Sequence, residues 1–327
     1  MLIEMHTDEG LVGIGETAGR EALEHHGRCA EALVGCDPLA IRQNVAKLKA
    51  RGERPAAISG VEMAMWDLLG KACGLPLFQL LGGCIRDRVK LCGLMGVKAP
   101  DGAADTAEQY VRTWGFASIK TKAGRSVDED VAIAQAIHKR VGLQALLRFD
   151  ANESYQPEDV IALAATYRQV NLEYVEQPVS RQQLGSYRQL REKSGVPIAL
   201  NESVTDAASV LAIARQSAAD ALVVDIPDAG GILAVQDLAA VAEAVGLPCA
   251  FHCWHDFGVK TAAMAHLVSA LPAFSLASDT TYHGLEADII AEPFVIQQGR
   301  IQVPTAPGLG VQLAMDVIER YRKKVID

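Results

Sequence analysis

The 327-residue sequence lacks any apolar run of the roughly 18–20 residues that a membrane span needs. It opens without a basic segment followed by an apolar one, so we expect no signal peptide. No cluster of Lys and Arg offsets the formal net charge of −9, which argues against a nucleic-acid partner. An anionic substrate stays compatible with this charge, because a pocket can be locally positive. The seven cysteines form no CxxC pair, which favours reduced thiols in the cytoplasm over disulfides or a zinc ribbon.

The sequence does contain a long alternation of short apolar runs and amphipathic stretches that begins at Arg88. Eight strands alternating with helices predict an α/β fold with a parallel barrel over residues 88–287. A barrel with a smaller second unit also fits the chain length. The eight runs are Val89–Cys92, Ala117–Lys120, Ala145–Phe149, Leu172–Val175, Pro197–Leu200, Ala221–Val224, Pro248–Phe251 and Ala273–Leu276.

The segments on either side of this alternation have a different pattern. Before it, Leu11–Glu16 indicates the end of a strand, and residues 21–34 and 58–80 have helical spacing. After it, residues 294–303 are expected to be extended, followed by a turn rich in Pro and Gly and a last helix. Residues 1–87 and 288–327 are therefore predicted to lie outside the barrel.

A polar residue ends each successive apolar run at an almost constant interval. One strand, one helix and two short loops need about this many residues, so each polar residue is expected at the carboxyl end of its strand. In a parallel barrel these ends converge on one mouth, which is where active sites lie. The residues are Lys122, Asp150, Glu176, Glu202, Asp225, His252 and Asp279, at intervals of 28, 26, 26, 23, 27 and 27.

Three of these residues are carboxylates on consecutive runs: Asp150, Glu176 and Glu202. Without a cation they would repel one another, and oxygen ligands select a hard ion, Mg²⁺ before Ca²⁺ or Zn²⁺. Alternatively, each is an ordinary polar residue at a strand end or a cap of the next helix. The neighbouring Asn201 could supply an amide oxygen instead of Glu202. We predict Glu202 as the third ligand because it keeps the interval and carries a charge.

Lys120 and Lys122 are two residues apart and share one face of a strand. Two adjacent ammonium groups near a metal lower the pKa of at least one, so a lysine here could serve as a base. The alternative is a solvated pair on a strand. Such pairs are common, and the position one interval before Asp150 favours the catalytic interpretation.

Asp225 and His252 end neighbouring runs and are predicted to form a dyad in which the aspartate orients the imidazole. A structural histidine in a wet cleft is the alternative. His252 and His255 could also suggest a zinc site, but their spacing is short and no matching pair of ligands follows elsewhere.

Taken together, these segments resemble the enolase superfamily, in its mandelate racemase and muconate lactonizing enzyme branch. The resemblance covers essentially the whole chain and is specific in combination. It rests on Gly13–Thr17, Gly60–Lys71, Leu80–Val89, Ile119–Lys122, Asp150–Asn152, Val175–Pro178, Asn201–Ser203, Gly230–Ile232 and Pro307–Val311.

The resemblance implies a modified TIM barrel, (β/α)₇β, over residues 88–287, with an α+β capping domain made from residues 1–87 and the returning segment 288–327. It implies that the Mg²⁺ ligands are Asp150, Glu176 and the Asn201/Glu202 position. Lys122 is implied as the base on one face of the substrate, with Lys120 supporting it. A small carboxylate substrate and a homo-oligomer are also expected.

An Asp at position 225 with His252 is similar to mandelate racemase and the acid-sugar dehydratases. The first expectation is therefore removal of the proton next to a carboxylate, followed by dehydration of an aldonate or aldarate to a 2-keto-3-deoxy acid. The second is a racemase or epimerase of a 2-hydroxy acid or a related carboxylate. The third is an inactive homologue that binds acids.

Two departures from the family pattern bear on these expectations. Relatives carry several dozen residues before the segment that matches Leu2–Glu4, including a loop that closes over the substrate. Their absence predicts a truncated and partly open cap. Mandelate racemase also has a substrate-binding Glu on its last strand, where this sequence has Ala277, and Asp279 is the candidate substitute.

Overall fold

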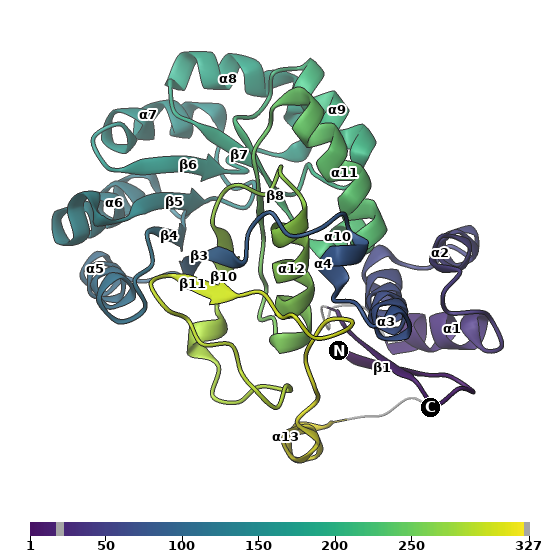
Figure 1. Cartoon of the computed structure of the whole chain (residues 1–327). Helices are drawn as coiled ribbons and strands as arrows, with labels where there is room; N and C mark the ends of the chain where they lie inside the picture. Colours follow the sequence, from purple (N-terminus) through teal and green to yellow (C-terminus); the bar gives the residue numbers. More distant parts are fainter. Residues whose placement is uncertain (18–22, 324–327) are drawn as a thin grey trace.

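Eight parallel strands follow one another around a barrel-like sheet in the order β10-β3-β4-β5-β6-β7-β8-β9 (Figure 1). The computed structural model describes residues 1–17 and 23–323. The strands are β3 (Arg88–Met95), β4 (Ser118–Lys122), β5 (Leu146–Asp150), β6 (Leu172–Glu176), β7 (Ile198–Leu200), β8 (Ala221–Val224), β9 (Cys249–Phe251) and β10 (Ser278–Thr280). This arrangement confirms the predicted modified TIM barrel.

Seven of the eight apolar runs coincide with these strands, and the last one does not. The sequence predicted a strand at residues 273–276, whereas β10 covers the polar residues Ser278–Thr280. Residues 273–276 instead lead from α12 to the sheet. Phe274 stacks on Phe251 of β9 at 4.0 Å between ring centroids, and the backbone of Leu276 donates to Cys249 O at 3.2 Å. The apolar side chains therefore serve the core beside the strand.

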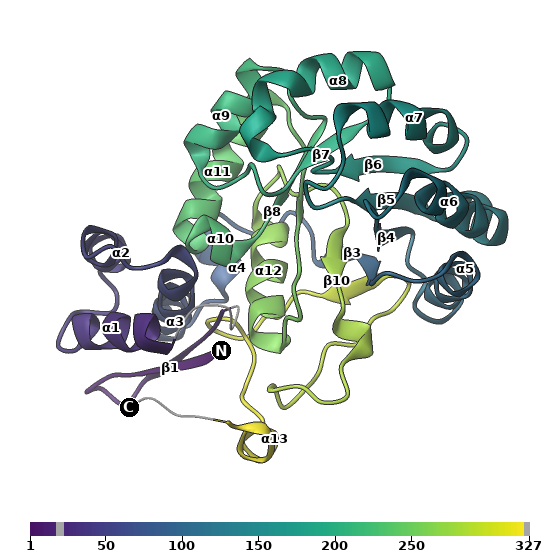
Figure 2. The same ribbon diagram turned by 180° about the vertical axis from the view of Figure 1, so that it is seen from behind.

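Helices pack around the outside of the sheet (Figures 1 and 2). They are α5 (Pro100–Gln109), α6 (Val127–Val141), α7 (Pro157–Tyr167), α8 (Tyr187–Ser194), α9 (Ala207–Arg215), α10 (Ile226–Ala229), α11 (Ile232–Val245) and α12 (Gly258–Ala270). Local signals explain several of their ends. Pro100 and Pro157 stand at the first helical position, and Ser126 accepts the backbone N–H of Glu129 to cap α6.

The capping part lies beside the barrel in both views (Figure 2). It contains the antiparallel strands β1 (Leu2–His6) and β2 (Val12–Glu16) and the helices α1 (Leu23–Leu33), α2 (Ile41–Ala50), α3 (Pro55–Cys73) and α4 (Leu77–Leu80). The helical spacing predicted for 21–34 and 58–80 agrees with α1 and with α3 and α4; residues 21 and 22 lie outside the described residues. Strand β2 lies directly on α3, since a Cβ added to Gly15 would come 2.0 Å from Gly60 O.

The returning segment contacts both parts. Its strand β11 (Arg300–Gln302) pairs antiparallel with β3, and it ends in α13 (Met315–Tyr321). Between them, the backbone N–H of Leu309 donates to Asp67 Oδ1 of α3 at 2.7 Å, and Gly308 O accepts from the backbone of Leu77 at 2.8 Å. No helix within the described residues is long and apolar enough to cross a membrane.

Two glutamates of the capping part bind the first turns of two barrel helices. Glu16 on β2 accepts the backbone N–H groups of Phe257 and Lys260 at the start of α12, both at 2.8 Å. Glu62 on α3 accepts those of Ile232 and Leu233 at the start of α11, at 2.6 and 2.8 Å. Burial raises the pKa of each glutamate to about 7, with Asp256 adding to the effect at Glu16. These carboxylates satisfy backbone donors that the helices leave unpaired.

Gly308 provides a test of how closely the returning segment approaches α3. Gly308 and Gly246 both have left-handed backbones, with φ of +73° and +72°, so an alanine at either costs about 1 kcal/mol in backbone strain. A Cβ at Gly246 meets nothing within 4 Å, whereas one at Gly308 lies 2.2 Å from Asp67 Oδ1. We expect Gly308→Ala to lower the free energy of unfolding by about 2–4 kcal/mol, and Gly246→Ala by clearly less, in urea denaturation. Equal losses would contradict this contact.

Candidate active site

The predicted site residues come together at the carboxyl-terminal ends of the barrel strands, which we call the mouth. Lys122, Asp150 and Glu176 are the last residues of β4, β5 and β6, and they lie opposite one another in the strand register. Asn201, Asp225 and His252 follow directly after β7, β8 and β9, while Asp279 lies within β10. The constant interval in the sequence therefore reflects consecutive barrel strands.

Lys120 is fully buried at the centre of a group of carboxylates. Its Nζ lies 2.7 Å from Glu176 Oε1, 2.7 Å from Asp279 Oδ2 and 3.2 Å from Asp150 Oδ2. Burial alone would lower the pKa of Lys120, but these carboxylates outweigh it and raise the pKa well above its ordinary value. The lysine pair predicted a lowered pKa for at least one of its members; for Lys120 the direction is the reverse, because the carboxylates contact it directly. Lys120 is therefore a fixed positive charge.

Lys122 differs from Lys120 in its access to the mouth. Its side chain is 29% exposed, and its Nζ contacts Asp150 Oδ2 at 2.6 Å and Asn152 Oδ1 at 2.7 Å. Of the two lysines, only Lys122 can therefore reach a molecule bound at the mouth.

Asp279 is held inside the barrel together with Arg148. Besides Lys120, it contacts Arg148 Nη1 through Oδ1 at 3.1 Å, and it is only 2% exposed. Its substrate-binding role stays a prediction, and in this arrangement both of its oxygens are engaged by cations. Arg148 was not among the residues predicted from the sequence. Its position two residues before Asp150, on the same strand face, is the signal that could have identified it.

The carboxylates at the mouth fit a hard divalent cation. Burial would raise the pKa of Asp150, but Lys120 and Lys122 outweigh it and lower the pKa to about 2. Burial and the nearby Asp150 raise the pKa of Glu176 to about 8. Two buried oxygens, Glu176 Oε2 and Glu202 Oε2, have no hydrogen-bond partner in the described part of the chain. Mg²⁺ binds carboxylate oxygens, and these two oxygens are not engaged by another described group.

The lysines hold these carboxylates in the present arrangement. Among residues 1–17 and 23–323, no group of three or more His, Cys, Asp or Glu side chains is arranged to hold a metal ion. Asp150 and Glu176 instead contact Lys120, and Asn152 donates to Glu202 Oε1 at 3.0 Å. The Mg²⁺ ligands therefore stay a proposal based on the donor set.

The choice between Glu202 and Asn201 depends on the loop after β7. The side-chain N–H of Asn201 donates to Val223 O at 3.0 Å, so a role for Asn201 would use its amide oxygen. Gln177 Oε1 accepts the backbone N–H groups of Asn201 and Ser203, both at 3.1 Å, and so fixes this loop. The unpartnered Oε2 keeps Glu202 as our proposed third ligand.

Asp225 and His252 face each other, but Asp225 also forms an ion pair with a lysine. His252 Nδ1 lies 3.7 Å from Asp225 Oδ2, which is beyond a hydrogen bond. Lys260, in the first turn of α12, contacts Asp225 Oδ1 at 2.7 Å and Asp256 Oδ1 at 3.0 Å. Lys260 was not among the residues predicted from the sequence, although a lysine four residues after Asp256 in a helical stretch is a recognisable ion-pair spacing. His255, the other histidine of the zinc alternative, is exposed.

Magnesium binding can be tested without a substrate. We expect Mg²⁺ added to chelated protein to raise its melting temperature, since a ligand of the folded state stabilises it. Glu202→Gln should weaken this effect more than Asn201→Ala if Glu202 is the third ligand. The matched control is Glu243→Gln, an exposed position on α11 that should leave the response unchanged. A wild-type protein whose melting temperature ignores Mg²⁺ would contradict the metal site.

The fold and the site define a barrel enzyme with carboxylates and lysines on successive strand ends and a capping part beside the barrel. Residues 102–317 match the family model of the enolase C-terminal domain-like proteins, and residues 1–82 match the mandelate racemase / muconate lactonizing enzyme N-terminal domain. The chain therefore belongs to the mandelate racemase/muconate lactonizing enzyme family of the enolase superfamily.

Relatives with several different activities are similar to this chain. The hydrophobic dipeptide epimerase of Enterococcus faecalis is 29% identical, over 95% of this chain and 90% of that protein. The probable glucarate dehydratase of Streptomyces coelicolor is also 29% identical, over 100% of this chain and 85% of that protein. A crystal structure of the E. faecalis dipeptide epimerase complexed with Mg and the dipeptide L-Leu-L-Tyr superposes with a TM-score of 0.89, at 28% identity, over 95% of this chain and 91% of that one.

Proposed function

We propose that this protein removes the proton next to a carboxylate in a Mg²⁺-dependent reaction and dehydrates an acid sugar to a 2-keto-3-deoxy acid. The observation that carries the proposal is the placement of two proton-transfer groups around the mouth. Lys122 ends β4 and His252 follows β9. Between them in the barrel, the proposed ligands Asp150 and Glu176 end β5 and β6, and Glu202 lies in the loop after β7. A substrate bound among these carboxylates would have one group on each face.

In this proposal, Lys122 or His252 takes the α-proton. If His252 takes the α-proton, it passes this proton to the hydroxyl that leaves the neighbouring carbon as water; if Lys122 takes it, His252 must enter the reaction as the imidazolium, with a proton from solvent. In both cases the enol product tautomerises to the keto acid. Lys120, fully buried and charged, contributes a fixed positive potential beneath the reacting carboxylate. A bound divalent cation would stabilise the negative charge that develops when the α-proton leaves.

A racemase or epimerase is the second candidate, and the same two groups support it. If Lys122 and His252 exchange a proton between the two faces of the α-carbon, no hydroxyl needs to leave. The similarity to dipeptide epimerases supports this candidate, and the similarity to the probable glucarate dehydratase supports the first. An inactive homologue that binds acids is the third.

A screen of aldonic and aldaric acids in D₂O separates the three candidates. Dehydration gives a 2-keto-3-deoxy acid, and a racemase gives the opposite enantiomer carrying deuterium at the α-carbon. Clean interconversion of enantiomers without keto acid would replace the first candidate by the second. No deuterium exchange with any acid or dipeptide, despite Mg²⁺ binding, would favour the third.

A further inference from the structure

Lys260 is a buried cation that the proposed reaction does not use. Its side chain is 3% exposed and lies between two carboxylates, 2.7 Å from Asp225 Oδ1 and 3.0 Å from Asp256 Oδ1. A lysine in the first turn of a helix is opposed by the positive end of the helix dipole. Its position therefore depends on these two carboxylates.

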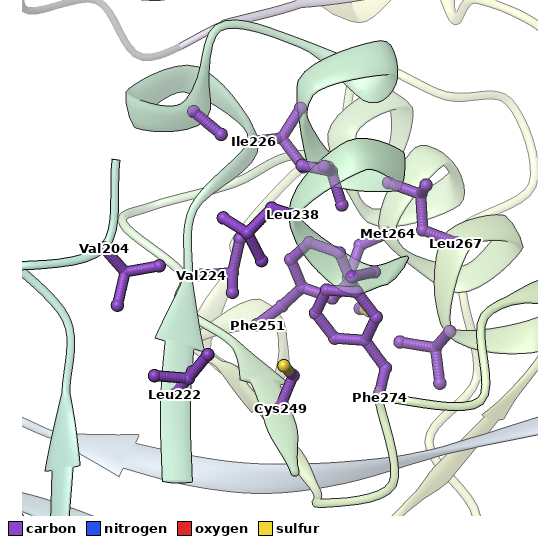
Figure 3. Packing of buried hydrophobic residues seen from close by; sticks show 14 of the residues in the cluster. Val204, Leu222, Val224, Ile226, Leu238, Cys249, Phe251, Met264, Leu267 and Phe274 are labelled. Atoms are coloured by element: carbon purple, nitrogen blue, oxygen red, sulfur yellow. The ribbon is translucent and has the colours of Figure 1, made fainter. Parts of the chain in front are cut away.

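The backbone around Lys260 is fixed from two sides. Glu16 of the capping part accepts its backbone N–H at 2.8 Å, which ties the start of α12 to β2. Beneath it, Met264 and Leu267 of α12 pack with Val224 and Phe251, the residues that immediately precede Asp225 and His252 (Figure 3). The helix that carries Lys260 and the strands that lead to Asp225 and His252 thus share one apolar core.

Lys260 decides which oxygen of Asp225 is left for His252. It occupies Oδ1, while Oδ2 lies 3.7 Å from His252 Nδ1. Neither Asp225 Oδ2 nor His252 Nδ1 has a hydrogen-bond partner among the residues that the structure describes. Burial would raise the pKa of Asp225, but the charges of Lys260 and His252 outweigh it and lower the pKa. Asp225 is thus an ionised, oriented acceptor.

The two aspartates beside Lys260 need a nearby cation. Asp225 is buried and Asp256 is partly buried, with 15% of its side chain exposed. Two adjacent carboxylates in such surroundings are not both readily ionised without a nearby positive charge. The charged groups around the dyad are mostly negative: Glu16 on β2 faces Asp256, with the Met1 amine beside both, while Asp279 on β10 and Asp150 on β5 face His252. If Lys260 were neutral, the groups that could take up a proton would be Asp256, Glu16 and His252.

We propose that Lys260 is a positioning residue of the Asp225–His252 dyad: it holds Asp225 Oδ1 and supplies positive charge beside the two aspartates, so that they do not keep His252 permanently protonated and its proton can move to and from a substrate. This inference rests on the proposed role of His252 in proton transfer. The neutral imidazole accepts a proton from the α-carbon and the imidazolium gives one to the leaving hydroxyl, so either role needs a proton that can move.

Nitrogen NMR of protein labelled with ¹⁵N-histidine tests the protonation of His252 without any substrate. The His252 signals are assigned by their loss in His252→Asn. In Lys260→Met, we expect the ratio of protonated to neutral His252 at neutral pH to rise about tenfold, equivalent to about one pH unit. Lys71→Met is the matched control, because Lys71 also pairs with an aspartate four residues earlier, Asp67 at 2.6 Å on α3. It should leave the His252 signals unchanged.

A second variant covers the case in which Lys260→Met does not fold. The double variant Lys260→Met/Asp256→Asn removes one cation and one anion, so the formal charge of the group is preserved. Asp225 then faces His252 alone, and the protonated fraction should again rise above that of the wild type. An unchanged fraction in either folded variant, or a wild-type His252 that is already fully protonated at neutral pH, would overturn the proposal. If the screen finds no acid that the protein converts, these NMR signals can still be measured. The role of Lys260 and the proposed function can therefore be rejected independently.

Discussion

Replacing His252 with Asn is expected to stop dehydration while leaving hydrogen exchange at the α-carbon, provided that Lys122 is the base for the substrate. The asparagine retains a polar side chain at this buried position but cannot deliver a proton to the leaving hydroxyl. Lys122, which enters from β4, can still remove the α-proton and return a deuteron from D₂O. The measurements are deuterium incorporation by NMR and keto-acid formation, each compared with the wild type.

The configuration of the substrate decides whether Lys122 or His252 is the base, and the two cases give different results for His252→Asn. If His252 is itself the base, both exchange and dehydration should fall by about 10²–10⁴-fold, the usual contribution of a positioned base. His255→Asn is the matched control, since His255 is exposed three residues later in the same loop, and it should leave both rates unchanged. Full dehydration by His252→Asn would show that the dyad assignment is wrong.

Replacing Lys122 with Met is expected to have the complementary effect on the other face of the substrate. Methionine keeps most of the side-chain length and cannot accept a proton. For a substrate whose α-proton faces β4, exchange and dehydration should both fall by about 10²–10⁴-fold. For a racemase, the variant should lose interconversion but retain exchange of the enantiomer that His252 deprotonates.

The stability of this variant must be measured, because Lys122 also pairs with Asp150 at 2.6 Å. Lys139→Met on the exposed face of α6 is the control for loss of a lysine. A folded Lys122→Met protein with the activity of the wild type would remove Lys122 from the mechanism.

The sequence predicts the barrel and the position of its mouth because both depend on local, repeated signals. Apolar runs and polar strand ends recur at a nearly constant interval, and the register of Lys122, Asp150 and Glu176 follows from the strand spacing. The last strand was misplaced because the apolar Phe274 serves the core beside β9, while the strand itself carries the buried polar residues Ser278 and Asp279.

The contacts inside the site could not be predicted, because they depend on which charged side chains from distant parts of the sequence pair with one another. The sequence shows that Lys120 and Asp150 are near each other, but not that Lys120 contacts three carboxylates at once. It also gives no reason for Lys260 of α12 to reach back to Asp225 rather than to solvent. Burial and three-dimensional packing determine which ion pairs form, and the spacing of residues along the sequence carries no information on either.

The two glutamates that reach from the capping part to α11 and α12 limit how this protein can be recombined with its relatives. Each carboxylate serves a helix that belongs to the other part of the chain, so a barrel transplanted under a foreign cap would lose acceptors for its helix starts. At Gly231, a Cβ would lie 2.3 Å from Glu62 Oε2, so the partner surface is also shaped for that one side chain. Chimeras that exchange caps within the family would therefore need to carry Glu16, Glu62 and Gly231 together as one inherited unit.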